Sequence, residues 1–101
     1  MAEFAGKWNA TLSTPIGTMH VVFDITEVDG VIGGVATSDA ESVDILEAVA
    51  DGDRLTWTQK VTTPMKLTLK FDVTVEGDRM SGGYKAGIFP SSKVEATRAS
   101  S

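Results

Sequence analysis

The sequence predicts an all-β protein: an antiparallel up-and-down barrel of eight short strands, in a single domain over residues 1–101. Apolar residues fall on every second position, most regularly from Arg54 to Tyr84, and a period of two is typical of a sheet with one buried face. Turn-forming residues recur at short, regular intervals along the whole chain. Closure of the sheet into a barrel is favoured because it removes two exposed edges that would invite aggregation.

Turns separate the predicted strands, and each turn contains Gly, Pro, Asp or Ser residues. These residues supply a positive φ, a fixed φ or a local side-chain hydrogen bond to the turning backbone. The predicted turns are at residues 14–17, 29–30, 38–41, 51–53, 62–64, 76–78 and 87–90.

In the first half of the chain, strands are predicted at residues 7–13, 18–28, 31–37 and 42–50. Alternation places these residues on the inner face: Trp8, Ala10, Leu12, Met19, Val21, Phe23 and Ile25. The fourth segment alternates less cleanly. Its Glu and Ala content would allow a helix over residues 39–50, but Val43, Ile45 and Val49 favour a strand.

In the second half, three strands are predicted between residues 54 and 86, and the last at residues 92–98. The predicted inner face continues with Leu55, Trp57, Gln59, Met65, Leu67, Leu69, Phe71, Val73, Val75, Met80, Gly82, Tyr84, Val94 and Ala96. Glycine pairs at residues 33–34 and 82–83 predict sharp bends where a small sheet must curl.

The two halves, about residues 6–50 and 54–98, resemble each other. An offset of 49 places Trp8 on Trp57, and an offset of 48 places residues 23–26 (Phe-Asp-Ile-Thr) on residues 71–74 (Phe-Asp-Val-Thr). This indicates an internal repeat with a pseudo-twofold relation. The alternative is that similar strands have converged on similar patterns.

Composition limits the possible functions. Hydrophobic residues make up 42% and charged residues 23% of the 101 residues, as in an ordinary globular domain. The chain has no cysteine, which excludes disulfides and thiolate metal sites, and its start lacks the pattern of a signal peptide. We therefore expect a cytoplasmic protein, although an excised domain would look the same. The net charge of −5 is spread along the sequence, so neither a nucleic acid nor a membrane is an expected partner.

The segment Gly6-Lys7-Trp8 resembles the start of the first strand in the calycin superfamily, the lipocalins and their relatives. The resemblance implies a lipocalin-like or streptavidin-like barrel, in which Arg98 near the end of the last strand lies over the Trp8 ring. The chain is much shorter than a typical lipocalin, without room for a long lid loop or a C-terminal helix. It is most similar to the small lipocalin-like domains of bacteria.

Few residues indicate catalysis or metal binding. His20, the single histidine, is predicted on the polar face of its strand. No cysteine or second histidine accompanies it, so we expect no transition-metal site and no cofactor. Carboxylates at residues 29, 51, 53, 76 and 78 lie in predicted turns, which explains them without a calcium site.

The remaining candidate is the inside of the barrel, where Gln59 and Tyr84 interrupt an apolar wall. The leading hypothesis is binding of a small, mostly apolar molecule in the barrel or at its mouth. The expected ligand-binding residues are Trp8, Phe23, Trp57, Gln59, Phe71, Met80 and Tyr84. An eight-stranded barrel is only just wide enough to be filled by its own side chains, so any cavity is expected to be small.

Two alternatives stay open. The first is an enzyme for acid/base isomerisation, cyclisation or elimination, with Glu47 and Tyr84 as its acid and base, which requires Glu47 to face inward. The second is a structural or oligomerisation module without a ligand, such as a homodimer, which a filled interior would favour. Its contact surface would use residues expected to be exposed: Phe4, Ile88, Phe89, Val22 and Val35.

Overall fold

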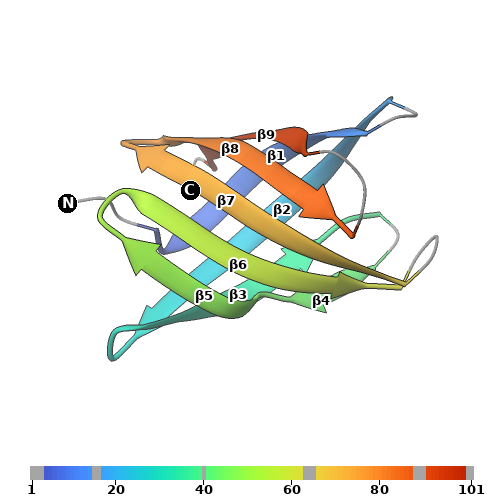
Figure 1. Ribbon diagram of the computed structural model, residues 1–101. Coiled ribbons are helices and arrows are strands. Elements are labelled where there is room, and N and C mark those ends of the chain that lie inside the picture. Colours follow the sequence, from blue (N-terminus) through green and yellow to red (C-terminus); the bar gives the residue numbers. More distant parts are fainter. Residues whose placement is uncertain (1–3, 15–16, 40, 63–65, 88–90, 100–101) are drawn as a thin grey trace.

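The structure is a computed structural model of the 101-residue chain, and it describes residues 4–14, 17–39, 41–62, 66–87 and 91–99. These residues form one antiparallel sheet that is nearly closed into a barrel (Figure 1). Its strands are β1 (Gly6–Thr14), β2 (Gly17–Val28), β3 (Val31–Thr37), β4 (Ser42–Asp44), β5 (Leu46–Asp51), β6 (Arg54–Val61), β7 (Leu67–Glu76), β8 (Arg79–Ala86) and β9 (Ser92–Arg98). In this described part of the chain, no helix is long and apolar enough to span a membrane.

The order of strands in the sheet is β4-β3-β2-β1-β9-β8-β7-β6-β5. Neighbours in the sheet are neighbours in sequence except β1 and β9, which pair antiparallel and join the end of the chain to its start. The termini and the turns at residues 29–30, 52–53 and 77–78 lie at one end of the barrel (Figure 1). We call this the terminal end, and we call the opposite end, which carries Val61, Leu67 and Ala86, the mouth end.

The structure has nine strands where eight were predicted, because the segment predicted as the fourth strand changes partner in its middle. Ser42–Asp44 pairs with β3, whereas Leu46–Asp51 pairs with β6. Ile45 lies between them, with a buried side chain and a backbone N–H that donates to the carbonyl of Gly34 at 2.9 Å. A β-bulge follows, where Glu47 has φ of 51°. Residues 42–44 and 46–51 are strands, so the helix considered for residues 39–50 is wrong.

The core lies on the inner face, as the alternation predicted. These hydrophobic residues are buried: Phe4, Trp8, Ala10, Leu12, Val21, Phe23, Ile25, Ala36, Ile45, Leu55, Trp57, Leu69, Phe71, Val73, Val75, Met80, Tyr84, Val94 and Ala96. The prediction was wrong for Met19, whose side chain is 39% exposed. The reason is its position along the strand: residues 17–20 at the start of β2 are all exposed, beyond the reach of the core.

Phe4 is the opposite case, because it was expected to be exposed and is buried, with 4% of its surface exposed. The Trp8 Nε1–H donates to the carbonyl oxygen of Phe4 at 2.9 Å, which fixes the segment before β1 against the core. The exposed position expected for Val35 is confirmed, with 37% of its surface exposed, and Val22 is half-buried. Met65, Ile88 and Phe89 lie outside the described residues.

The pairing registers of the two halves agree. Trp8 pairs with Phe23, and Phe23 with Ala36; at matching positions Trp57 pairs with Phe71, and Phe71 with Tyr84. Two copies of one unit would give this agreement, but so would similar hairpins. The duplication itself stays a prediction.

In each of the two glycine pairs predicted to bend the sheet, one glycine lies directly against a neighbouring strand. A Cβ on Gly34 would lie 2.0 Å from the carbonyl oxygen of Asp24, and a Cβ on Gly82 would lie 2.1 Å from that of Asp72. The other two glycines are less confined. A Cβ on Gly33 would meet nothing within 4 Å, and one on Gly83 would lie 3.1 Å from the carbonyl oxygen of Ser92. Strands can therefore approach closely at Gly34 and Gly82 because neither residue has a side chain.

Candidate functional site

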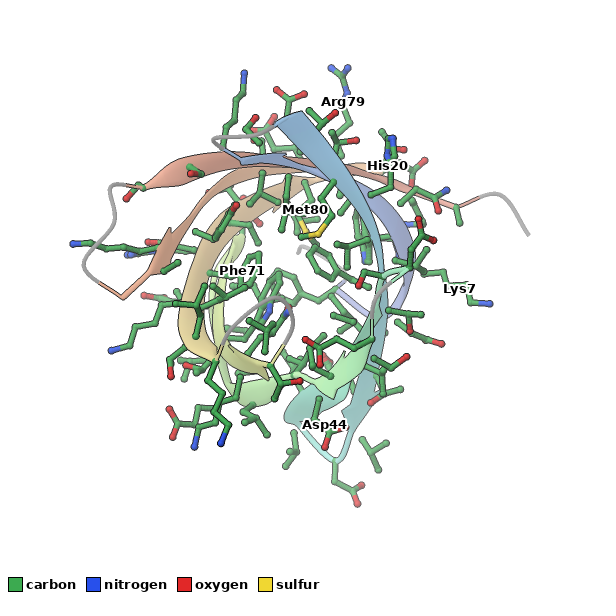
Figure 2. All side chains as sticks on the ribbon, turned by 90° about the vertical axis from the view of Figure 1, so that its right-hand side faces the viewer. Lys7, His20, Asp44, Phe71, Arg79 and Met80 are labelled. Atoms are coloured by element: carbon green, nitrogen blue, oxygen red, sulfur yellow. The ribbon has the colours of Figure 1, made fainter. Side chains whose placement is uncertain are left out.

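The structure buries all the side chains predicted to bind a ligand. Their exposed fractions run from 0% for Trp8 and Phe23 to 8% for Tyr84. Seen along the barrel axis, Phe71 and Met80 lie inside the ring of strands, while Lys7, His20, Asp44 and Arg79 lie outside it (Figure 2). The predicted ligand-binding residues therefore come from five different strands and meet in one interior.

Aromatic rings pack against one another across this interior. The Trp57 ring stacks on Phe71 with 4.9 Å between centroids, and Phe71 stacks on Tyr84 at 5.3 Å. Phe23 meets both Trp57 and Phe71 edge-on, at 5.1 Å and 5.7 Å. Each such pair contributes ~1 kcal/mol beyond the burial of its surface. The centre of the barrel is therefore occupied by its own side chains.

The polar exceptions on the inner wall find partners within the protein. Gln59 Oε1 accepts a hydrogen bond from Trp57 Nε1 at 2.7 Å. The Tyr84 hydroxyl donates to the backbone carbonyl of Ser13 at 2.8 Å. Both side chains are thus inward and buried, as predicted; Gln59 satisfies Trp57 on its own strand, whereas Tyr84 joins β8 to β1.

The side-chain amide nitrogen of Gln59, Nε2, has no hydrogen-bond partner among the described residues. No fully buried side-chain nitrogen or oxygen in that part of the chain lacks a partner, so this amide keeps some contact with solvent although the residue is only 4% exposed. Gln59 therefore offers its oxygen to the core and its nitrogen to the outside.

Apolar side chains follow Gln59 on the inner face toward the mouth end. Val61 pairs with Leu67 across β6 and β7, one inward position beyond Gln59 and Leu69, and Ala86 pairs with Leu69. Val61, Leu67 and Ala86 pack against the core but are only half-buried. The arrangement is an apolar rim above a single amide donor.

The terminal end is closed by Arg98. Its guanidinium carbon lies 4.3 Å from the centroid of the Trp8 ring, which confirms the contact expected from the resemblance. Arg98 also donates to the carbonyl of Ala5 at 2.7 Å and to the Asp78 carboxylate at 3.0 Å. These bonds tie β9, the segment before β1 and the β7–β8 turn together, so this end offers no entrance at Trp8.

The residues proposed for acid/base chemistry do not meet. Glu47 is exposed in the bulge of β5, so the hypothesis of an inward, dry Glu47 is wrong. The positive φ at this residue turns the side chain away from the face that simple alternation predicted. His20 is exposed, and the described residues contain no group of three His, Asp or Glu side chains that could hold a metal ion.

Sequence reasoning missed two depressions on the surface. One, of about 340 Å³, lies where β4 faces β6; near it, both carboxylate oxygens of Glu41 accept hydrogen bonds from Thr62, at 2.9 and 2.8 Å. The other, of about 400 Å³, lies over β7 and β8 and is lined by Lys70, Asp72, Gly83, Tyr84, Lys85 and Ser91. Beside it, Arg54 hydrogen-bonds the Asp72 carboxylate, which lowers the pKa of Asp72. Alternation puts Lys70 and Lys85 outward, but only the pairing register brings them together.

Comparison with known proteins adds no family. No protein-family model matches the chain, and neither a curated protein nor a solved structure matches it.

Proposed function

We propose that this chain is a non-catalytic binding protein that takes a small, mostly apolar molecule at the mouth end of its barrel. The observation that carries the proposal is the solvent-reaching Nε2 amide of Gln59 beneath a half-buried apolar rim of Val61, Leu67 and Ala86. A ligand with one hydrogen-bond acceptor would cover the rim and accept from this amide. Apolar sites with a few directed polar groups are the usual form of small-molecule sites.

The packed interior supports the mouth over the inside as the place of binding. The Trp57, Phe71 and Tyr84 rings stack on one another, so a molecule entering the centre would have to displace them. Of the predicted ligand residues, Gln59 and Tyr84 lie nearest the mouth end. Trp8, Phe23 and Met80 act as core in this proposal.

Membership of the calycin superfamily is part of the proposal. It is supported by the cation–π contact between Arg98 and Trp8 and by the antiparallel barrel. A cytoplasmic location also stays a prediction.

Nile red, a neutral fluorophore with a carbonyl acceptor, tests the mouth site. The Gln59→Glu variant keeps an oxygen to accept from Trp57 Nε1 but replaces the free donor with a second acceptor. We expect this variant to bind Nile red about three- to tenfold more weakly, the effect of losing one hydrogen bond. Lys60→Gln, which changes the net charge by the same amount on the outer face, should bind like the unmodified chain.

Native mass spectrometry after mild purification would look for a ligand that is already bound. The proposal fails if no bound or displaceable molecule is found and Trp57→Ala changes only the stability. It also fails if Gln59→Glu and Lys60→Gln bind Nile red equally well.

A second candidate is an interaction module that forms a homodimer. It is favoured by three exposed apolar side chains: Val28 is 66% exposed, Val31 is 70% exposed and Val49 is 60% exposed. Val28 and Val31 face each other across the β2–β3 hairpin, at the terminal end. Light scattering at high protein concentration should then give a dimer mass that Val31→Thr lowers. A monomer at all concentrations would contradict it.

A further inference from the structure

A glycine, Gly83, is among the residues that line the surface depression over β7 and β8. Gly83 pairs with Asp72 on β7 and with Lys93 on β9, and all three positions are on the outer face. Lys70 and Lys85 lie directly opposite each other in the next row of the ladder. The depression, which Gly83, Lys70 and Lys85 line together with Asp72, Tyr84 and Ser91, has a volume of about 400 Å³. We call this depression the Gly83 hollow.

The charges around the Gly83 hollow are mainly positive, although the whole chain carries −5. Lys70 and Lys85 line the hollow, and two further cations, Lys93 and Arg54, lie on the neighbouring strands. The two nearby carboxylates are already engaged: Asp72 is held by Arg54, and Glu95 lies 2.9 Å from Lys93. Within the described residues, Lys70 and Lys85 have neither an ion pair nor a side-chain hydrogen bond.

The pair of lysines is unfavourable for the sheet itself. Like charges directly opposite each other on neighbouring strands destabilise a sheet. Both lysines are exposed, so water and salt screen much of this repulsion, and a bound anion would offset the rest. The protein therefore keeps at this place an arrangement that folding alone disfavours.

The β2–β3 hairpin shows that the fold does not require it. At the same distance from its turn, this hairpin carries Val22 opposite Thr37, where β7–β8 carries Lys70 opposite Lys85. Likewise, Val35 stands at the position that corresponds to Gly83. At these positions the β2–β3 hairpin carries uncharged side chains, whereas the β7–β8 hairpin carries two lysines and a glycine.

We propose that the Gly83 hollow binds the phosphate group of a small, soluble molecule. The ammonium groups of Lys70 and Lys85 contact the phosphate oxygens as point charges, and the hydroxyl of Ser91, which lines the same hollow, donates a hydrogen bond. Because Gly83 has no side chain, the phosphate can approach the sheet beside the two lysines. Arg54 offsets the charge of Asp72, the carboxylate on the rim. This site is separate from the mouth and does not depend on the function proposed there.

Nuclear magnetic resonance titration of the full chain with inorganic phosphate tests the proposal, with chloride at equal ionic strength as reference. We expect the backbone amide signals of Gly83, Lys85 and Ser91 to shift and to saturate with a Kd on the order of 1 to 10 mM. The double variant Lys70→Val/Lys85→Thr places in β7–β8 the residues that β2–β3 carries at the matching positions, so the fold should tolerate it. In this variant we expect binding at least about tenfold weaker. The control is Lys7→Thr, which removes an exposed lysine from β1.

Each outcome supports or overturns the proposal. Saturating shifts with phosphate and with phosphoserine, lost in the double variant but kept in Lys7→Thr, support it. Equal responses to phosphate and chloride overturn it, as does a phosphate response that the double variant keeps. Cosedimentation with phosphatidic acid vesicles, without a response to free phosphate, would overturn it in favour of a membrane surface.

Discussion

The Trp57 indole is 2% exposed, and its N–H has Gln59 Oε1 as its acceptor. The Gln59→Met variant keeps the volume of the side chain but leaves this buried donor without a partner. We expect the free energy of unfolding to fall by about 1–3 kcal/mol, the cost of an unsatisfied buried polar group. Urea unfolding followed by tryptophan fluorescence measures it.

Gln59→Glu is a second comparison: it keeps an oxygen for Trp57 but adds the cost of a buried carboxyl group. A second control, Lys60→Met on the outer face, should change stability little. If Gln59→Met were as stable as the unmodified chain, the hydrogen bond between Trp57 and Gln59 would contribute nothing to the free energy of unfolding.

Sequence alternation assigns each residue to a face but not to a depth along the barrel axis. It placed Trp57, Gln59 and Tyr84 inward, and the structure agrees. It also placed Met19 inward, but Met19 is in the part of β2 that extends beyond the end of the core. The position of Phe4 depends on a hydrogen bond from Trp8 to a segment outside any strand, which no periodicity reports.

At the scale of elements, the glycines of β3 and β8 allow a matched experiment. A Cβ on Gly82 would collide with the backbone of β7, at 2.1 Å from the Asp72 oxygen and 2.7 Å from the Val73 Cα. Because backbone atoms on both strands would have to move, Gly82→Ala should open the β7–β8 pairing and lower the melting temperature by at least about 10 °C. Gly83→Ala meets a single atom at 3.1 Å and should cost much less.

The same contrast exists in the other hairpin. Gly34→Ala should be as damaging as Gly82→Ala, and Gly33→Ala should be nearly neutral because its Cβ would be in open space. Thermal unfolding followed by circular dichroism compares the four variants. Similar losses within each pair of adjacent glycines would contradict the close approach of the strands at residues 34 and 82.

Strand positions could be predicted from turn residues and alternation because both are local. The limits of β3 and β9 agree with the prediction, at residues 31–37 and 92–98. The interruption of the strand at Ile45 could not be predicted, because it arises where one segment pairs first with β3 and then with β6. The Gly83 hollow was missed for a similar reason, since it depends on the register of three strands. The lysines around the hollow are far apart in the sequence, so the sequence alone showed no cluster of positive charge.

At the scale of the whole molecule, the barrel has two unequal joints. β9 pairs along its length with β8 on one side and with β1 on the other. The opposite joint is made by β4 and β5, each of which pairs with one neighbour only. Past Asp44, the described residues connect β3 to this segment through the bond from Ile45 to Gly34. The molecule is therefore closed firmly by β9 and loosely by β4 and β5.

Hydrogen exchange should report this difference. Amides on a strand bonded along both edges open only when the sheet opens, whereas those of a one-sided strand exchange through local opening. We expect the amides of β5 that form bonds to β6 to exchange at least about tenfold faster than those of β9, measured by nuclear magnetic resonance in deuterated water. The β6 amides bonded to β7 serve as the internal control and should match β9. Equal protection of β5 and β9 would mean that the bulge at Glu47 does not weaken the joint, and that the barrel closes as tightly at β5 as at β9.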